Sequence, residues 1–399
     1  MPMIKMSDLD LKGKRVLIRE DLNVPMKNGV ISSDIRIRAA LPTIKQALKA
    51  GAQVMIMSHL GRPEEGSHDE QFSLAPIAAR LSTLLKQDVP LITNWVNGFS
   101  MKDRPVVLLE NVRLNSGETD NETPLSKKMA ALCDIFVMDA FATSHRAEAS
   151  TCGIIEYAPA SCAGPLLAGE VEALTKIMHN PKHPVVAIVG GSKVSTKLSL
   201  LEALAQKVDT LIIGGGIANT FLAAEGYTVG RSLYEPDLID EAERLMHIAK
   251  ERGAEIPVPT DVIVGDKLSD DSESAIRLVS QIDDVEKVFD IGPDTTKRLV
   301  SIIKKAKTIL WNGPVGAFEV EQFSKGTEAI AHAVAESAGF SVAGGGDTLA
   351  AIEAYGVADK INYISTGGGA FLSFLEGKKL PAIAALEEHA AKNKIEKVT

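Results

Sequence analysis

The stretch VGGSKVSTKLSL, residues 189–200, ends an apolar run with two glycines and then carries two lysines four positions apart. Glycine lets the backbone approach a ligand closely, and the N-terminus of a helix directs free N–H groups at an anion. We expect Lys193 and Lys197 to share one face of a helix, with their ammonium groups binding phosphate as point charges. The stretch lacks the P-loop pattern G-x-x-x-x-G-K-[ST], so a different phosphate site is predicted.

Four more glycine-rich stretches follow apolar runs in the second half of the chain. They are GGGIANTF (214–221), NGPVG (312–316), GGGDT (344–348) and GGGA (367–370). One such stretch alone is typical of a tight turn between a strand and a helix, whereas five in one half favour a bound ligand. Asp347 is a hard oxygen ligand suited to Mg²⁺, directly or through water, and it can equally cap the helix that follows.

The first half places polar and charged residues after its apolar runs. Arginines and their polar neighbours recur there, namely Arg36, Arg62, Arg113 and Arg146 with His59, Asp21 and Asn23. Guanidinium groups bind carboxylate and phosphate in bidentate geometry, and the Asp and Asn side chains can hydrogen-bond a hydroxyl. The set predicts a pocket for a small acid with phosphate, carboxylate and hydroxyl groups. A single arginine is as often a surface ion pair, the role expected for Arg38, and a histidine such as His59 can simply cap a loop.

Nine short apolar runs rich in β-branched residues must position these groups. They are RVLIR (15–19), QVMIM (53–57), VVLL (106–109), DIFVM (134–138), VVAIV (185–189), TLIIG (210–214), TILWN (308–312), FSVAG (340–344) and NYIST (362–366). Segments of helical period separate them, which predicts α/β domains with parallel sheets. Ligands of such sheets bind outside the carboxyl ends of the strands, so we expect one site in each half.

Length and composition set the domain count and exclude some classes of function. A chain of 399 residues exceeds one ordinary core, and a helical segment followed by NPKHP marks a seam near 165–184. The expected domains are 1–168 and 185–385, joined by a helix or hinge at 169–184. A net charge of -9 argues against a general nucleic-acid or membrane surface.

The location expected from the sequence is the cytoplasm. The first residues, MPMIKMSDLDLKGKR, contain no apolar stretch of the kind found in a secretory signal, and no run approaches the ~18 to 20 apolar residues of a membrane helix. The three cysteines, Cys133, Cys152 and Cys162, have no metal-ligand spacing and are expected to be reduced thiols, mostly in the core.

Taken in order, these motifs resemble the phosphoglycerate kinase family. The matching stretches are RVLIREDLNVP, SHLGRP, LLENVR, DAFATSHR, GPLL, AIVGGSKVSTKL, GGGIANTFL, WNGPVGAFE, GGGDTLAAI and ISTGGGAFLSFLEGKKLP, spanning about residues 4–381. The resemblance implies two Rossmann-like domains facing across a cleft, with a tail at 386–399 packing back on the first. It also implies reversible Mg-dependent phosphoryl transfer from 1,3-bisphosphoglycerate to ADP, giving 3-phosphoglycerate and ATP.

The resemblance also assigns roles to individual residues. The phosphoglycerate-binding positions are Asp21, Asn23, Arg36, His59, Arg62, Arg113 and Arg146. The nucleotide-binding positions are Lys193, Lys197, Gly214, Glu319 (on the ribose), Gly344, Gly345, Gly346, Asp347 and Thr348, with Asp347 toward Mg²⁺. The chain departs from the family pattern at Glu20 and Leu22, where that pattern has Val and Phe, and at Ala142, Ser144 and Ser192. None of these changes removes a proposed ligand.

For the chemical step, Arg36 and Lys197 are expected to be the chief cations on the transferring group. Mg²⁺ and backbone amides at 344–346 and 367–369, including Gly345 and Gly368, share that charge. ADP attacks an already activated acyl phosphate, so no general base is required, and His59 is assigned to binding. A monomer that closes about a hinge is expected, with small-molecule substrates and no nucleic-acid or membrane partner.

Two other classes of function were weighed against the kinase. A nicotinamide-dependent oxidoreductase requires G-x-G-x-x-G after a strand and an acidic residue about 20 positions later, and the glycine clusters here lack that spacing. A non-catalytic metabolite-binding protein would not need phosphate-binding cations in both halves. A coupled ATP assay separates the last alternative from a kinase.

Overall fold

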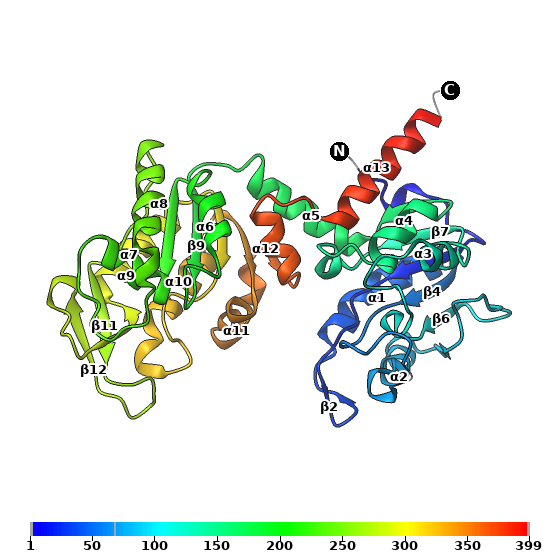
Figure 1. The fold of residues 1–399 in the computed structure, drawn as a ribbon, viewed down its shortest axis with the longest axis horizontal. Coiled ribbons are helices and arrows are strands. Elements are labelled where there is room, and N and C mark those ends of the chain that lie inside the picture. Colours follow the sequence, from blue (N-terminus) through cyan, green and yellow to red (C-terminus); the bar gives the residue numbers. More distant parts are fainter. Residues whose placement is uncertain (1–2, 68, 397–399) are drawn as a thin grey trace. The chain divides into compact units, whose positions relative to one another are not determined.

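The computed structural model describes residues 3–67 and 69–396 and divides into two compact units (Figure 1). The chain passes from the first unit to the second between Glu172 and Ala173, inside helix α5 (Pro165–Met178), and returns between Lys378 and Lys379. Residues 1, 2, 68 and 397–399, which belong to the predicted first domain and tail, lie outside the described residues.

The first unit is built on a six-stranded sheet with the order β5-β6-β4-β1-β7-β8, in which every pair is parallel. The strands are β1 (Arg15–Arg19), β4 (Gln53–Met57), β5 (Leu91–Ile92), β6 (Val106–Leu109), β7 (Ile135–Met138) and β8 (Ser161–Ala163), and a small hairpin joins β2 (Met26–Lys27) and β3 (Val30–Ile31). The helices are α1 (Ile35–Lys49), α2 (Ala75–Leu85), α3 (Thr123–Ala130), α4 (Ile154–Tyr157), the start of α5, and α13 (Pro381–Glu396).

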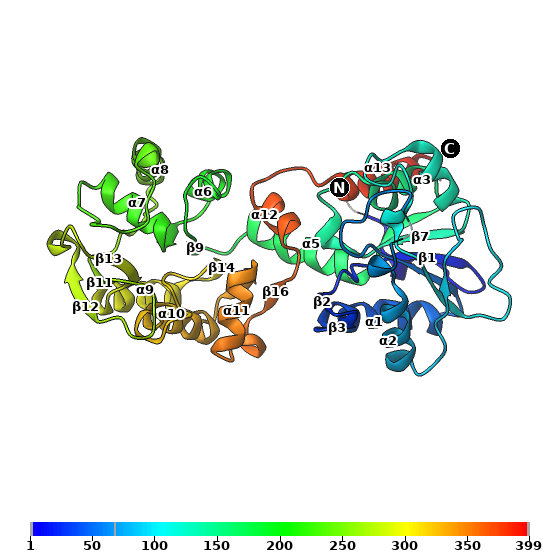
Figure 2. The ribbon, with the colours of Figure 1, turned by 60° about the horizontal axis from the view of Figure 1, so that its bottom comes forward.

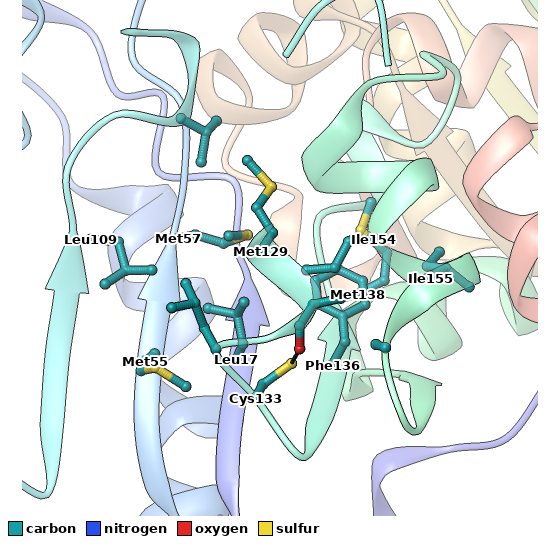
Figure 3. Close-up of a cluster of buried hydrophobic side chains, with 14 of the residues drawn as sticks. Leu17, Met55, Met57, Leu109, Met129, Cys133, Phe136, Met138, Ile154 and Ile155 are labelled. Atoms are coloured by element: carbon teal, nitrogen blue, oxygen red, sulfur yellow. Dashed lines mark hydrogen bonds between the residues drawn. The ribbon is translucent and has the colours of Figure 1, made fainter. Parts of the chain in front are cut away.

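Both faces of this sheet are covered by helices (Figure 2). Successive strand residues point to opposite faces, so Val16 and Ile18 pack with α1 and α2 while Leu17 packs with α3, α4 and α13. Figure 3 shows the second of these cores, where Leu17 lies near Met55, Phe136 and other buried side chains. Burial on both faces explains why these strands read as continuous apolar runs.

The C-terminal helix α13 belongs to the first unit. The backbone N–H of Ala382 donates to the carbonyl oxygen of Ser144 at 3.2 Å, and the N–H of Ser161 donates to Nε2 of His389 at 3.0 Å. Ala382 and Leu386 are buried in the core shared with α3 and α4. The chain therefore returns to its first unit after completing the second.

The second unit contains a five-stranded parallel sheet with the order β10-β9-β14-β15-β16 and a three-stranded antiparallel sheet with the order β12-β11-β13. The strands are β9 (Val185–Gly190), β10 (Thr210–Gly214), β11 (Asp261–Gly265), β12 (Ser274–Leu278), β13 (Lys287–Ile291), β14 (Thr308–Asn312), β15 (Phe340–Gly344) and β16 (Tyr363–Ser365). The helices are α6 (Leu198–Ala205), α7 (Gly216–Ala224), α8 (Ile239–Glu251), α9 (Pro293–Lys305), α10 (Lys325–Glu336), α11 (Gly346–Ala354) and α12 (Gly369–Leu375).

The α/β class with parallel sheets is confirmed, and each of the nine predicted strands is present to within a residue at either end. The strands missed were β5 and β8, which have two and three residues, the two-residue strands β2 and β3 of the hairpin, and the antiparallel sheet, whose edge strand β12 is largely exposed. Within the described residues, no helix has the length and apolar character required to cross a membrane. Cys133 and Cys162 are buried and Cys152 is partly buried.

Candidate functional site

The seven predicted acid-binding residues all belong to the first unit and gather at the carboxyl edge of its sheet. Asp21 and Asn23 follow β1, His59 and Arg62 follow β4, Arg113 follows β6, and Arg146 follows β7. These four strands are adjacent in the order β6-β4-β1-β7, so the residues after them lie on one edge. Arg36 stands in the first turn of α1.

Arg36 is held by the loop that follows β1. Its Nη1 donates to Asp21 Oδ2 at 2.9 Å and to the carbonyl oxygen of Asn23 at 2.9 Å. The Asn23 side chain in turn accepts a hydrogen bond from the N–H of Gly61 at 2.9 Å, which ties this loop to the one after β4. The Arg36 side chain stays 37% exposed, and a guanidinium has five N–H donors, so donors remain for a ligand.

Arg113 and Arg146 share one carboxylate. Arg113 Nη2 donates to Glu148 Oε1 at 2.8 Å and Arg146 Nη1 lies 3.8 Å from the same oxygen, so one negative charge faces two positive charges. Arg62 is exposed, and its guanidinium makes no hydrogen bond or ion pair with any described residue. The edge therefore carries an excess of positive charge in an otherwise acidic protein.

His59 is a neutral hydrogen-bond donor in this arrangement. Arg19 Nη2 lies 3.3 Å from His59 Nδ1, and because a guanidinium only donates, Nδ1 must accept and Nε2 must carry the proton. Burial holds the pKa of His59 well below its usual range, and the positive charges of Arg19, Arg113, Arg146 and Arg36 lower it further. The imidazole thus offers an N–H to a ligand rather than a charge.

Several supporting residues escaped the sequence analysis. Arg19 is fully buried and donates from Nε to Ser150 Oγ at 3.0 Å, and Ser150 is hydrogen-bonded to Glu118. Burial raises the pKa of Glu118 to about 7, although Arg19 and the bonds from Ser150 oppose that shift. Asn111 accepts from the N–H groups of Leu60 and Arg113 at 3.2 and 3.1 Å, joining the loops after β4 and β6. The one available signal was Arg19 itself, a charged residue ending an apolar strand.

A cavity of about 710 Å³ lies beside this edge at the ends of β5 and β6, lined in part by Trp95, Glu110 and Asn111. None of the seven predicted residues lines it, and its charged lining residues are acidic. The lining of this cavity therefore lacks the cations that an anionic ligand requires.

The predicted nucleotide-site residues all belong to the second unit, where Lys197 is held by the ends of two strands. Its Nζ donates to the carbonyl oxygen of Gly190 at 2.6 Å, to that of Asn312 at 3.1 Å, and to Asn312 Oδ1 at 2.7 Å. These three acceptors use all three ammonium protons. Burial lowers the pKa of Lys197 to about 8, and the negative charge of Asp347 opposes the shift.

The prediction that Lys193 and Lys197 share a helix face is wrong. Helix α6 begins at Leu198, and residues 193–197 form a turn in which the N–H of Lys197 donates to the carbonyl oxygen of Val194 at 2.9 Å. Ser195 fixes this turn by donating from its backbone N–H and its hydroxyl to Glu235, at 2.9 and 2.6 Å. Lys193 is consequently exposed while Lys197 is partly buried.

The glycines of the second unit separate into two kinds. A Cβ on Gly214 would lie 2.4 Å from Val315 Cα, and one on Gly344 would lie 2.7 Å from the Phe371 ring, so packing within the protein requires both. Gly346 differs, because a Cβ there would meet nothing within 4 Å and its φ is not positive. The protein's own structure gives no reason for glycine at the exposed start of α11, which favours a ligand at that position.

The remaining predicted residues follow the neighbouring strands β14, β15 and β16. Gly345 precedes α11 with φ 105°, and Gly368 precedes α12 with φ 50°. Asp347 is exposed in the first turn of α11, whereas the buried Thr348 hydroxyl donates to Gly344 at 2.9 Å and accepts from the N–H of Gly313 at 2.8 Å. The Thr348 side chain thus holds the loops in place. Glu319, the predicted ribose contact, is exposed after β14.

Comparisons with known proteins identify the family of this chain. The family model of phosphoglycerate kinase matches residues 6–378. The structure of phosphoglycerate kinase from Coxiella burnetii matches with 55% identity and a TM-score of 0.95, covering 98% of this chain and 100% of that one. The crystal structure of phosphoglycerate kinase from Pyrococcus horikoshii OT3 matches with 33% identity and a TM-score of 0.80, again covering 98% and 100%. The chain therefore belongs to the phosphoglycerate kinase family, the kinases that transfer a phosphoryl group between 1,3-bisphosphoglycerate and ADP.

Proposed function

We propose that the first unit binds 3-phosphoglycerate or 1,3-bisphosphoglycerate and that the second binds ADP or ATP. One observation carries this division. The parallel sheet of the first unit has a cluster of arginines at its carboxyl edge, whereas that of the second unit has Lys197 and glycines such as Gly346, which the fold itself does not require. Arg62, Arg113, Arg146 and the neutral His59 would bind the acid's phosphate and carboxylate, while Asp21 and Asn23 would contact its hydroxyl. The predicted domain 1–168 would therefore bind the acid, and the predicted domain 185–385 would bind the nucleotide.

In the chemical step, an oxygen of the ADP β-phosphate forms a bond to the phosphorus of the acyl phosphate, and the carboxylate of 3-phosphoglycerate leaves. Phosphoryl transfer depends mainly on positioning and on stabilising charge over three equatorial oxygens. Arg36 has free donors for those oxygens, and the Lys197 ammonium can exchange one carbonyl acceptor for a phosphate oxygen. Neither the attacking phosphate nor the leaving carboxylate needs a general base, consistent with an unprotonated Nδ1 on His59 that already accepts from Arg19.

A nucleotide substrate implies Mg²⁺, and the residues near α11 fit that ion. The described residues contain no cluster of three or more His, Cys, Asp or Glu able to hold a metal alone. Mg²⁺ usually keeps several waters and takes one or two carboxylates plus substrate phosphates, which matches a single exposed Asp347 at a helix start. The ion would neutralise phosphate charge, with Asp347 as its protein ligand directly or through water.

Transfer requires the reacting atoms to approach to about 3–3.5 Å with water excluded. Because the two substrates are assigned to different units, we propose that the units close about points near 164–184, including Gly164, Gly169 and NPKHP. Small-angle scattering checks this with the apo protein, each binary complex and the ternary complex. A smaller radius of gyration only with both ligands supports closure, and an unchanged radius in all states contradicts it.

We further propose that the protein is a monomer and that it is located in the cytoplasm.

Arg62→Ala should raise the KM for 3-phosphoglycerate about 10- to 100-fold while leaving kcat within a factor of a few, because it removes ground-state binding by an exposed cation. The matched control is Arg104→Ala. Arg104 is an exposed arginine just before β6, so it lies at the amino edge of the sheet, whereas Arg62 lies at the carboxyl edge. Steady-state kinetics with each substrate varied provides the measurement. If Arg62→Ala instead weakened nucleotide binding and left the acid unaffected, the division between the units would be wrong.

Gly346→Ala should weaken Mg-ADP binding about tenfold or more, because the added methyl group occupies space assigned to the nucleotide. The folded protein should be unaffected or more stable by ~0.5 kcal/mol, since alanine reduces the entropy of the unfolded chain where its φ is tolerated. Calorimetric titration with Mg-ADP and with 3-phosphoglycerate, together with thermal unfolding, measures both effects. Unchanged Mg-ADP affinity would show that Gly346 does not face the nucleotide.

The activity itself is tested by incubating purified protein with ATP and 3-phosphoglycerate and following ADP. We expect ADP formation that saturates with both substrates, requires Mg²⁺ and stops when either substrate is omitted. ADP formation independent of 3-phosphoglycerate would indicate an ATPase, and binding of both ligands without ADP formation would indicate a non-catalytic binding protein.

A further inference from the structure

Two buried carboxyl groups lie next to the loop that follows β1 and contains Asp21 and Asn23. Neither group has a part in the mechanism above. Glu20 directly follows β1 and Asp139 directly follows β7, the strand paired with β1. Their exposed fractions are 1% and 2%. Glu20 is also one of the positions at which this chain departs from the family pattern. Two acids this deeply buried require a structural or functional account.

Asp139 fastens two helices to the sheet. Its Oδ2 accepts a hydrogen bond from Thr43 Oγ1 at 2.5 Å, and its Oδ1 accepts from the N–H groups of Leu166 and Leu167 at 2.8 and 3.1 Å. Thr43 lies on α1 seven residues after Arg36, and therefore on the same face two turns away. The two leucines lie in the first turn of α5, the helix through which the chain leaves the first unit.

Glu20 has the opposite environment. Both of its carboxyl oxygens are buried, and neither accepts a hydrogen bond from any donor among the described residues. An ionised carboxylate without donors is costly in such a site, whereas a protonated one needs only an acceptor. Asp139 is the neighbouring acceptor, because Glu20 and Asp139 directly follow Arg19 and Met138, which are paired across β1 and β7, and both side chains are buried there. Burial raises the pKa of Glu20 well above its usual range, and the charges of Asp139 and Asp21 raise it further against the opposing effect of Arg19.

We propose that Glu20 and Asp139 share one proton and that this O–H···O contact is a positioning element for the acid site. Glu20 lies between two residues of that site's framework. Its backbone carbonyl accepts from Arg19 Nη1 at 2.6 Å, and Arg19 is the hydrogen-bond partner of His59. The next residue, Asp21, pairs with Arg36. The pair therefore joins the loop that holds Arg36 to the helix that carries it.

Loss of the shared proton places two carboxylates against each other in a low-dielectric setting, which is strongly unfavourable. The other groups around the pair do not cancel this repulsion. Arg19 is a cation on the β1 side but is already bonded to Ser150 and to the Glu20 carbonyl, while Asp21 adds negative charge. From β8, Cys162 faces Asp139 as a neutral thiol, because burial raises its pKa. From α1 and α5, the Thr43 hydroxyl and the backbone N–H groups of Leu166 and Leu167 donate to Asp139, and none of these groups titrates.

The direction of the pH effect follows from these contacts. A carboxyl whose pKa is raised on folding stabilises the folded arrangement below its unfolded pKa, and that contribution is lost as pH rises through the folded pKa. Separation of Glu20 from Asp139 would displace the Asp21 loop relative to α1. Given the proposed acid site, on which this step rests, 3-phosphoglycerate should bind more weakly at alkaline pH.

The test combines infrared spectroscopy with kinetics on wild type, Glu20→Gln and Glu156→Gln. Glu156 is an exposed acid of α4 and provides the matched control. At neutral pH, the difference spectrum of wild type minus Glu20→Gln should contain the carbonyl stretch of one buried protonated carboxyl group, and the spectrum of wild type minus Glu156→Gln should not. The subtraction removes the other buried acids, such as Glu118, because all three proteins contain them. The glutamine amide donates to Asp139 without a titrating proton, so this variant should fold and retain substrate binding.

From about pH 6 to pH 9, the KM for 3-phosphoglycerate should rise roughly threefold more in wild type than in Glu20→Gln, the effect of a pKa coupling of about half a unit. The titrations of the substrate, Glu118 and Lys197 affect the KM of both proteins equally, so they cancel when the two KM profiles are compared. Absence of the carbonyl band from the difference spectrum of wild type minus Glu20→Gln, or identical KM profiles, would overturn the proposal. An intact band in a protein without saturable 3-phosphoglycerate dependence at any pH would instead overturn the proposed function, and the positioning role with it.

Discussion

Arg36→Ala should lower kcat by roughly 10³-fold and change the dissociation constant of 3-phosphoglycerate by less than about tenfold. Arg36 uses one nitrogen to reach Asp21 and the Asn23 carbonyl, and its side chain stays 37% exposed. A cation that meets the transferring group mainly in the transition state lowers kcat and kcat/KM together when removed. Steady-state kinetics combined with calorimetric titration of 3-phosphoglycerate separates the two effects.

Arg38→Ala is the matched control for this experiment. Arg38 lies two residues later on the same helix and pairs with Asp34, which also pairs with Arg80. Its loss should leave kcat within about twofold, because exposed ion pairs contribute little. If Arg36→Ala kept most of its kcat, or lost activity only in proportion to acid binding, its assignment to the transferring group would fail.

Lys197→Ala should lower kcat by roughly 10²- to 10³-fold, the usual effect of removing one group that stabilises developing charge. Lys193→Ala is the control, because Lys193 is exposed four residues earlier and should mainly weaken nucleotide binding. Removal of Lys197 also leaves the Gly190 and Asn312 carbonyls without their ammonium donor, so thermal unfolding must be measured in parallel.

The pH profile distinguishes loss of charge from loss of structure at Lys197. Burial lowers its pKa to about 8 in the free protein, and the ammonium is the form that binds phosphate. The kcat/KM for Mg-ATP should therefore fall as pH rises through about 8, and kcat should fall only at higher pH because bound phosphate raises the pKa. A Lys197→Ala protein with the wild-type alkaline limb would assign that titration to another group.

The fold followed from the sequence at the longer strands of the two parallel sheets, which are buried on both faces. Runs such as RVLIR and TILWN are apolar at every position that meets a helix layer, so their assignment needed no tertiary information. The antiparallel sheet was missed because β12 alternates between exposed and partly buried residues and resembles a loop in composition. The two-residue strand β5 is too short to produce any pattern.

The sequence predicted which residues form the candidate site but not which residues they contact. Arginines after strands identified the acid edge, whereas Glu118, Glu148 and Asn111 support it from loops distant in sequence. The error at Lys193 has a physical origin, since Ser195 bonds to Glu235, forty residues away, and holds a turn where local spacing predicted a helix. Spacing alone also could not separate Gly346, which the fold does not require, from Gly214, which Val315 requires.

Direct transfer between the two substrates is the central claim, and phosphorus NMR of the purified protein with Mg-ATP and 3-phosphoglycerate tests it most directly. The account predicts that an acyl-phosphate resonance of 1,3-bisphosphoglycerate and the resonances of ADP appear together in equal amounts, with no early inorganic phosphate, and that both disappear when Arg36→Ala replaces wild type over the same time. Inorganic phosphate formed in step with ADP from the outset, without an acyl phosphate, would contradict it.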